Sequence, residues 1–296
     1  MMRKIITLLA IISASNFVHA NTDSLRNKII TYCNNYQATV GVAVTFIEDT
    51  DTLSVNGHKM LPMLSVYKLP IAMCVLNNVD KGGLTLNTPI NISNEDMHQN
   101  TWSPLRNKLN GADTSIQLSE IIQYTLIQSD NNCCDILLKT IGGVKTVQAY
   151  LKQIGLPNIE VNNTEWEMFQ SPNLIYSNKA TPSDITSLLN KLYNQKLFSD
   201  SCFNFLWKTL SDYSTGNNRI RGRLPKETEV AHKTGTSVTT KNGITPAIND
   251  VGIITLPNGK HIALAIFVSE SKENRETNER IIAEITEIIW EYATRH

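Results

Sequence analysis

The sequence predicts an α/β (α+β) fold, in which an antiparallel sheet built from both ends of the chain carries an inserted all-helical lobe. Alternating, β-branched segments lie near the two ends, each accompanied by an amphipathic helical segment, whereas the middle has helical periodicity. We therefore divide the chain into a signal peptide (1–20), an α/β lobe (21–61 and 213–296) and an all-α lobe (62–212).

The first twenty residues have the pattern of a cleaved secretory signal. Arg3 and Lys4 precede a ten-residue apolar stretch, Ile5–Ala14, which is too short to span a bilayer. Val18 and Ala20 stand at positions −3 and −1 of a cut after Ala20. We expect a periplasmic, soluble mature chain, since no second apolar run reaches membrane-spanning length.

The N-terminal part of the α/β lobe is predicted to be a helix followed by a strand. Asn21–Ser24 is a capping cluster, and the apolar Leu25, Ile29 and Cys33 follow at helical spacing. Val40–Phe46 alternates and is β-branched, which indicates a strand.

The middle of the chain repeats the helical pattern. The helical segments are 118–128, 136–141, 144–151 and 185–193, with Gly142-Gly143 as a break between two of them. Residues 161–181 have no clean period and are rich in Asn, so we expect a long loop, which in a compact domain is usually functional.

The C-terminal part returns to strands and ends in a helix. Val251–Leu256 and Ile262–Val268 are predicted strands, joined by a turn at Pro257–Gly259. Apolar residues then share one face of a final helix: Ile281, Ile285, Ile288, Ile289 and Tyr292.

Charge and cysteine content exclude several classes of function. The chain has 27 basic and 27 acidic residues, so nothing favours a nucleic-acid partner. No CxxC, HxH or HExxH occurs, so we expect no metal and no other cofactor. The five cysteines, an odd number, are interpreted as buried small hydrophobes: Cys33, Cys74, Cys133, Cys134 and Cys202.

Ser65-Val66-Tyr67-Lys68 is an SxxK motif followed by an apolar helical segment, so we expect it to open a helix. Residues i and i+3 share a helix face, which would put Lys68 beside the Ser65 hydroxyl, a weak nucleophile without such help. The motif alone is weak evidence, because the chain contains a second copy, Ser269–Lys272, which we interpret as a solvated loop after a strand.

Two further motifs make the SxxK motif at Ser65 significant. Ser129-Asp130-Asn131 follows a predicted helix, and Lys233-Thr234-Gly235 follows Val230-Ala231, where a strand is expected to begin. Either alone could be a turn or a strand edge. SxxK, SDN and KTG in this order, 64 and then 104 residues apart, form a highly specific combination.

With these motifs, essentially the whole mature chain resembles the class A serine β-lactamases, closest to the VEB/PER-like branch. The stretches that support the branch are Thr101–Pro104, Cys134-Asp135, Ala231–Ser237 and Asn249–Gly252. The resemblance implies the serine β-lactamase/penicillin-binding fold with a five-stranded sheet. It also implies hydrolysis of the β-lactam amide bond of penicillins and cephalosporins, with antibiotic resistance as the result. We expect a monomer whose partners are β-lactams and water.

The resemblance also implies roles for single residues. Ser65 is acylated, Lys68 takes part in its activation, and Ser129 relays a proton to the lactam nitrogen. The backbone N–H groups of Ser65 and Thr236 form an oxyanion hole. The residues implied to bind substrate are Trp102, Asn131, Arg219, Lys233, Thr234, Gly235, Thr236 and Ser237. Arg219 is implied to be a second cation, with Arg221 as its competitor.

The base that hydrolyses the acyl-enzyme is one of two carboxylates. Trp166-Glu167 imitates the Trp-Glu common in the family, but Glu165 lies 36 residues after Ser129, at the spacing of the family. Glu165 also fits the Glu-x-x-Met pattern of the VEB/PER-like branch. We choose Glu165, because a general base must reach the water it activates.

Three departures from the family pattern bear on activity and specificity. Phe169 stands where most of class A has Asn and the branch has His, and its side chain cannot hydrogen-bond to the deacylating water. Asp135 replaces the usual Asn, which puts the familiar loop shape in doubt. Leu64, before the nucleophile, is Gln in the branch, so substrate preference does not carry over.

Two alternative functions share these motifs. A penicillin-binding transpeptidase or carboxypeptidase usually lacks the loop carboxylate that Glu165 provides. A β-lactam receptor is acylated but deacylates poorly, and normally needs a membrane segment to transmit its signal. Phe169 is the feature that favours a receptor, because its side chain cannot hydrogen-bond to the deacylating water.

Overall fold

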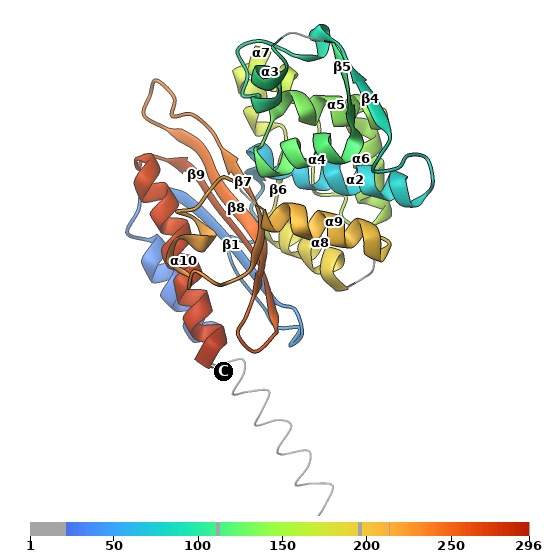
Figure 1. Cartoon of the computed structure of the whole chain (residues 1–296). Coiled ribbons are helices and arrows are strands. Elements are labelled where there is room, and N and C mark those ends of the chain that lie inside the picture. The colour runs from blue at the N-terminus through green and yellow to red at the C-terminus, as the bar shows by residue number, and fades with distance from the viewer. Residues whose placement is uncertain (1–21, 111–112, 195–196, 213, 296) are drawn as a thin grey trace, which may run out of the picture.

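A computed structural model describes residues 22–110, 113–194, 197–212 and 214–295 of the chain. The predicted signal peptide, 1–20, lies outside these residues. The predicted α/β (α+β) class is confirmed: a five-stranded antiparallel sheet packs between terminal helices and a helical lobe (Figure 1).

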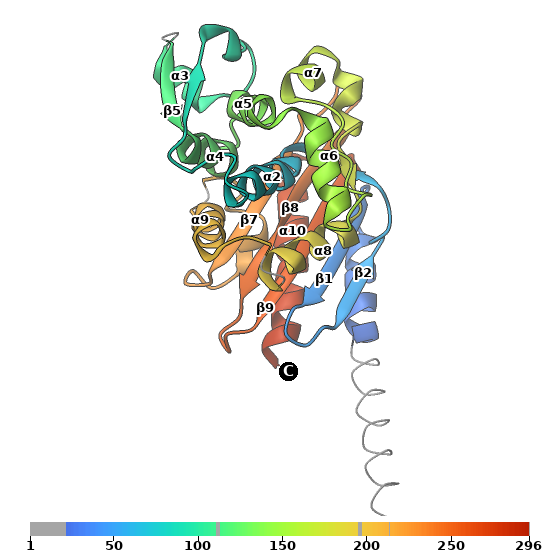
Figure 2. The ribbon, with the colours of Figure 1, turned by 90° about the vertical axis from the view of Figure 1, so that its right-hand side faces the viewer.

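The sheet has the strand order β2-β1-β9-β8-β7 and so combines both ends of the chain. Its strands are β1 (Thr39–Phe46), β2 (Thr52–Val55), β7 (Val230–Thr236), β8 (Thr245–Thr255) and β9 (His261–Ser271). Ten of the eleven residues of β8 are buried, because helices cover both faces of the sheet. One face carries the helix at 22–33 and α10 (Arg275–Arg295), and the opposite face meets the helical lobe (Figure 2).

The helical lobe surrounds α2 (Lys68–Asp80), which follows the 3-10 turn η1 (Leu64–Tyr67). The other helices of the lobe are α3 (Pro104–Leu109), α4 (Leu118–Ile127), α5 (Asn131–Ile141), α6 (Val144–Gln153), α7 (Glu165–Gln170), α8 (Pro182–Asn194) and α9 (Asp200–Ser211). Its short segments are β3 (Leu61–Pro62), β4 (Pro89–Ile92), η2 (Asn94–Asp96), β5 (Thr114–Gln117), η3 (Pro172–Tyr176) and β6 (Lys179–Ala180), and η4 (Ile220–Arg223) leads back to the sheet.

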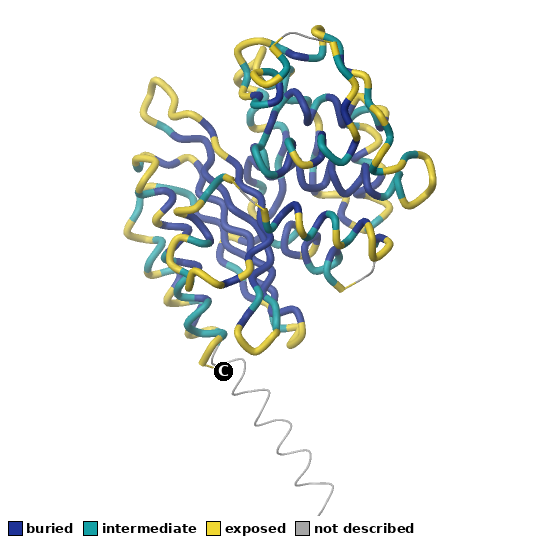
Figure 3. Tube along the Cα trace, viewed as in Figure 1, coloured by how far each residue is buried: buried dark blue, intermediate teal, exposed yellow. Residues whose placement is uncertain are grey.

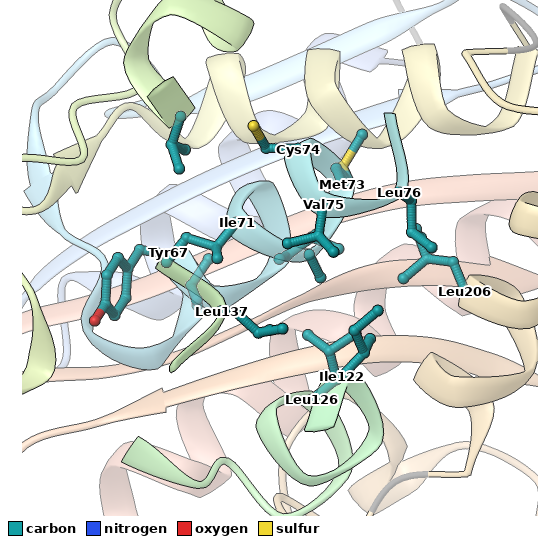
Figure 4. Close-up of a cluster of buried hydrophobic side chains, with 14 of the residues drawn as sticks. Tyr67, Ile71, Met73, Cys74, Val75, Leu76, Ile122, Leu126, Leu137 and Leu206 are labelled. Atoms are coloured by element: carbon teal, nitrogen blue, oxygen red, sulfur yellow. The ribbon is translucent and has the colours of Figure 1, made fainter. Parts of the chain in front are cut away.

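Two apolar cores lie on the two faces of the sheet. One joins the terminal helices to the outer face, and the other fills the helical lobe and reaches the inner face (Figure 3). In the second core, α2 packs against α4, α5 and α9 through side chains that include Leu76, Ile122, Leu137 and Leu206 (Figure 4). Residues 68–76 of α2 are all buried, so this helix fixes the centre of the lobe.

Two sequence expectations are corrected by the structure. Ser269–Lys272 is not a solvated loop, because β9 continues through Ser271, and Ser269 and Ser271 are both buried. A left-handed Glu270 (φ 49°) lies between these two serines. Residues 161–181 are not wholly loop, since they contain α7, η3 and β6.

All five cysteines are free thiols, four of them buried and Cys33 partly so. In the described ranges, no helix is long and apolar enough to cross a membrane. The same residues contain no cluster of three His, Cys, Asp or Glu side chains that could hold a metal ion.

Candidate active site

Ser65 lies where the chain enters the central helix. It belongs to the 3-10 turn η1, and α2 begins three residues later at Lys68, whose backbone N–H donates to the Ser65 carbonyl. The motif therefore forms a turn that leads into the helix, rather than its first turn. The preceding Leu64 has a left-handed backbone (φ 48°), a conformation that is unusual for a bulky residue and that often marks a functional site.

The Lys68 ammonium group is fully buried and has three oxygen partners. It donates to the Ser129 carbonyl at 2.8 Å and to Asn131 Oδ1 at 2.6 Å, and it lies 3.0 Å from Glu165 Oε1. Two of these contacts are hydrogen bonds and the third is an ion pair, because the buried Glu165 Oε1 accepts no hydrogen bond from the described residues. Lys68 thus joins the SxxK motif to SDN and to the loop carboxylate.

In the SDN motif, Ser129 and Asn131 face the site, whereas Asp130 supports the fold. Ser129 is left-handed (φ 56°), and its Oγ accepts from Lys233 Nζ at 3.0 Å. Asn131 uses its oxygen on Lys68 and its amide on Thr101 Oγ1, at 2.8 Å. Asp130 is buried and caps α5 by accepting from the Cys133 N–H.

Lys233 comes from β7 and faces the same space. Its ammonium donates to Ser129 Oγ and, at 3.0 Å, to the Thr234 carbonyl. Burial, followed by the positive charge of Lys68, lowers the pKa of Lys233 to about 7. The site therefore has two buried amines, and the charge of Lys233 is sensitive to pH near neutrality.

Gly235 allows β7 to approach the turn that carries the nucleophile. A Cβ at this position would lie 2.4 Å from the Met63 carbonyl oxygen and 3.2 Å from Leu64 Cβ. Only glycine permits this approach without a shift of the backbone.

Arg219 and the hydroxyls of β7 form a buried polar layer. The Arg219 guanidinium donates to the carbonyls of Gly235 and Asn249, to Thr236 Oγ1 at 2.7 Å and to Glu279 Oε1 at 3.2 Å. It is 2% exposed, so the cation acts inside this layer, whereas Arg221 is partly exposed and donates to the Lys226 carbonyl.

The two remaining hydroxyls of β7 have different partners. Thr234 pairs with Thr215 Oγ1 at 2.9 Å. Ser237 Oγ donates to the Ala247 carbonyl and accepts from the Ala247 N–H, so its side chain is part of the sheet edge.

The two candidate carboxylates have different environments. Glu165, at the start of α7, reaches Lys68, whereas Glu167 is exposed and accepts from the backbone N–H of Thr164 in a capping box. Asp135 accepts from the backbone N–H groups of Glu165 at 2.8 Å and Trp166 at 2.9 Å. Burial and the nearby Glu165 charge raise the pKa of Asp135 to about 7.

Two aromatic residues that the sequence analysis singled out, Trp102 and Phe169, are exposed. Trp102 is 63% exposed and donates through its ring N–H to the Gln128 carbonyl, so it is not a core tryptophan. Phe169 is 46% exposed and stacks on Trp166, with ring centroids 5.4 Å apart.

Sequence reasoning missed several residues that support the site. Thr101, Thr215 and Glu279 hold Asn131, Thr234 and Arg219, and Asn249 donates to the carbonyls of Pro62 and Met63 just before η1. Thr101 and Asn249 lie in stretches quoted for the resemblance, but the sequence does not show which groups they touch.

A serine at a helix entrance, a buried lysine three residues later and a carboxylate beside that lysine define a serine enzyme that works through an acyl intermediate. Residues 24–293 match the β-lactamase enzyme family. Because this match covers most of the chain, the chain belongs to that family, and it is a class A serine β-lactamase.

Named relatives agree with this assignment. The chain is 43% identical to β-lactamase VEB-1 of Pseudomonas aeruginosa, over 98% of this chain and 97% of the relative. It is 35% identical to extended-spectrum β-lactamase PER-1 of the same organism, over 97% and 92%. Its structure matches the crystal structure of TLA-1 extended-spectrum β-lactamase with a TM-score of 0.91 at 42% identity, covering 93% and 99% of the two chains. The predicted resemblance to the VEB/PER-like branch is confirmed.

Proposed function

We propose that this protein hydrolyses the amide bond of β-lactam antibiotics in the periplasm, as a monomer, through an acyl-Ser65 intermediate, and so gives β-lactam resistance. The observation that carries the proposal is the buried Lys68 ammonium, which contacts SDN and Glu165 at once. The periplasmic location rests on the signal pattern at 1–20.

Acylation begins with attack of Ser65 Oγ on the lactam carbonyl. Lys68 takes part in removing the Ser65 proton, and the backbone N–H groups of Ser65 and Thr236 stabilise the oxyanion. Such donors contribute roughly 3–4 kcal/mol each in comparable enzymes. The close approach of β7 to η1 at Gly235 supports this role, because it brings the two backbone segments together.

Ring opening needs a proton on the lactam nitrogen. Ser129 supplies it, since its Oγ already accepts a hydrogen bond from Lys233 and can pass its own proton onward. Lys233, Thr234 and Thr236 bind the substrate carboxylate, and Arg219 adds positive charge behind Thr236. Asn131 binds the acylamide side chain, and Trp102 flanks the mouth of the cleft.

Hydrolysis of the acyl-enzyme uses Glu165 as the general base on water. Glu165 adjoins Lys68 and its backbone is fixed by Asp135, whereas Glu167 is occupied in the cap of α7. Because Phe169 stacks on Trp166 at the surface, it takes no part in binding this water.

Stopped-flow measurement with excess chromogenic cephalosporin tests the proposal. Wild-type protein should turn over many equivalents, Ser65→Ala should neither acylate nor turn over, and Glu165→Gln should release one equivalent and stop. Glu167→Gln is the matched control and should keep turning over. A single burst from the wild-type protein would instead indicate a receptor or a penicillin-binding protein, and a trapped Glu167→Gln would overturn the choice of base.

A further inference from the structure

The helix that carries Glu165 has a single apolar anchor in the lobe, the partly buried Met168. α7 is six residues long and none of its residues is buried. A helix this short is not stable without outside contacts. The position of Glu165 therefore depends on what holds α7 against the lobe.

A stack of three rings clamps α7 from the side. The His98 ring lies on the Trp166 ring with centroids 4.1 Å apart and planes 10° from parallel. Phe169 lies against Trp166 at 5.4 Å and 16°. Trp166 directly follows Glu165, so the stack acts beside the base.

The His98 end of the stack is fixed to the core of the lobe. The His98 carbonyl accepts from Arg106 Nη1 at 2.9 Å and from Asn132 Nδ2 at 3.2 Å. Asn132 is buried in α5, next to Asn131 of the site. The backbone of His98 is thus held by the lobe, while Trp166 and Phe169 belong to the element that needs support.

We propose that His98 is a positioning residue for hydrolysis, because its ring holds Trp166 and thereby keeps Glu165 at the acyl-enzyme. Phe169 completes the stack, which explains how this chain tolerates an apolar residue where most of class A has Asn. The inference rests on the proposed role of Glu165 as the base.

The stack should act on one step of the reaction only. Ser65 and Lys68 belong to η1 and α2, which are held by the core, so their geometry does not depend on His98. A displaced catalytic group costs about 100-fold in rate per ångström. Loss of the His98 ring should therefore slow deacylation and leave acylation unchanged.

Single-turnover and burst kinetics of His98→Ala, with a chromogenic cephalosporin, test the inference. We expect the deacylation rate constant to fall about 10- to 100-fold while the acylation rate constant stays at the wild-type value. His98→Phe keeps a flat ring and should restore deacylation. His58→Ala, which removes an exposed histidine outside the site, is the matched control and should behave as wild type.

The outcomes separate the inference from the proposed function. Rate constants of the acylated fraction do not depend on how much protein is folded, so loss of stability alone would not imitate the expected result. Unchanged deacylation in His98→Ala, an equal loss in both steps, or failure of His98→Phe to restore the rate would overturn the role of His98. Wild-type turnover by Glu165→Gln would instead overturn the base. If both assignments hold, His98→Ala added to Glu165→Gln should slow deacylation no further.

Discussion

The proposed nucleophile, Ser65 in η1 before α2, and the proposed base, Glu165 in α7, lie on segments that are held in opposite ways. Nine consecutive residues of α2, beginning at Lys68, are buried, whereas α7 has no buried residue. Burial of one large apolar side chain contributes about 1.5–3 kcal/mol, and a cap or ring contact about 1 kcal/mol. The nucleophile is therefore fixed by the same packing that holds the fold, and the base by the hydrogen bonds of Asp135, a helix cap, a ring stack and the partly buried Met168. Global stability and deacylation should respond to different residues.

Leu76→Ala should have the largest effect on the free energy of unfolding. Leu76 is fully buried on α2 and packs in the cluster that contains Leu206 (Figure 4). Truncation leaves a cavity and should cost about 2–5 kcal/mol in denaturant-induced unfolding. The kcat per active site, counted by burst titration, should stay within about twofold of wild type, because Lys68 lies two turns away.

The matched control for this substitution is Lys81→Ala, at the exposed end of the same helix, which should change neither quantity. A loss of kcat in Leu76→Ala without a loss of stability would contradict the proposed division of labour.

In contrast to Leu76→Ala, Asp135→Asn should slow deacylation more than it lowers the stability of the fold. The Asp135 carboxylate accepts two backbone N–H groups of α7, and an amide oxygen can replace only one of these acceptors while its NH₂ faces the other donor. We expect deacylation to slow about 10- to 100-fold at pH 8, measured as decay of the acyl-enzyme.

The pH dependence gives the same prediction a second readout. The Asp135 pKa is raised from 3.8 to about 7, so the native protein keeps this proton between these pH values while the unfolded chain releases it. This group's contribution to stability therefore falls as the pH rises through that window. Deacylation needs the ionised form and should rise through pH 7. Asp135→Asn should lose both slopes, and an unchanged deacylation profile would show that Asp135 does not control α7.

The contrast between the two helices also explains what the sequence could predict. The buried sheet and the α2 segment have strong periodicity, so the α/β class, the outer helices and the main strands follow from the pattern of apolar residues. The pairs β3–β6 and β4–β5 have two to four residues per strand, too few for a period to be visible.

The site was predictable where a motif encodes chemistry locally and not where contacts span the chain. SxxK, SDN and KTG indicated Ser65, Ser129 and Lys233 by their order and spacing together with the family resemblance that they carry. The ring contact of His98 with Trp166 joins residues 68 positions apart, and the ion pair of Arg219 with Glu279 joins residues 60 apart. Such pairs depend on tertiary packing, so no local sequence pattern predicts them.

Burial also acts on Lys233 in β7, where it changes the protonation of a side chain rather than the position of a helix. Its pKa of about 7 means that the free enzyme loses this cation as the pH rises above 7. Because the substrate is an anion, kcat/KM should fall about tenfold per pH unit above that value. Lys233→Arg should remove this limb, since a guanidinium stays protonated. A flat profile of wild-type kcat/KM from pH 6 to 9 would contradict the lowered pKa.

Thr164→Ala should have the smallest effect on the rates. It allows the most direct comparison of a helix outside the core, α7, with a helix in the core, α9. The Thr164 Oγ1 accepts from the Glu167 N–H at 3.1 Å and caps α7, as the Ser199 hydroxyl caps α9 through the Cys202 N–H. Either substitution by alanine removes a cap of about 1 kcal/mol, and Ser199→Ala also removes the hydrogen bond that the Ser199 hydroxyl donates to Asp80 Oδ1 at 2.6 Å. At α9, whose inner face lies in the core, Ser199→Ala should lower the stability of the whole fold and leave the rates unchanged.

At α7 the same loss should stay mostly local, because no residue of this six-residue helix is fully buried and Met168 is its one side chain packed against the apolar core of the lobe. Thr164→Ala should therefore slow deacylation about fivefold with an unchanged unfolding midpoint, and Thr164→Ser should restore it. Equal losses of stability in the two alanine variants would mean that α7 unfolds together with the core. This result would contradict the claim that the nucleophile and the base are held by independent sets of contacts.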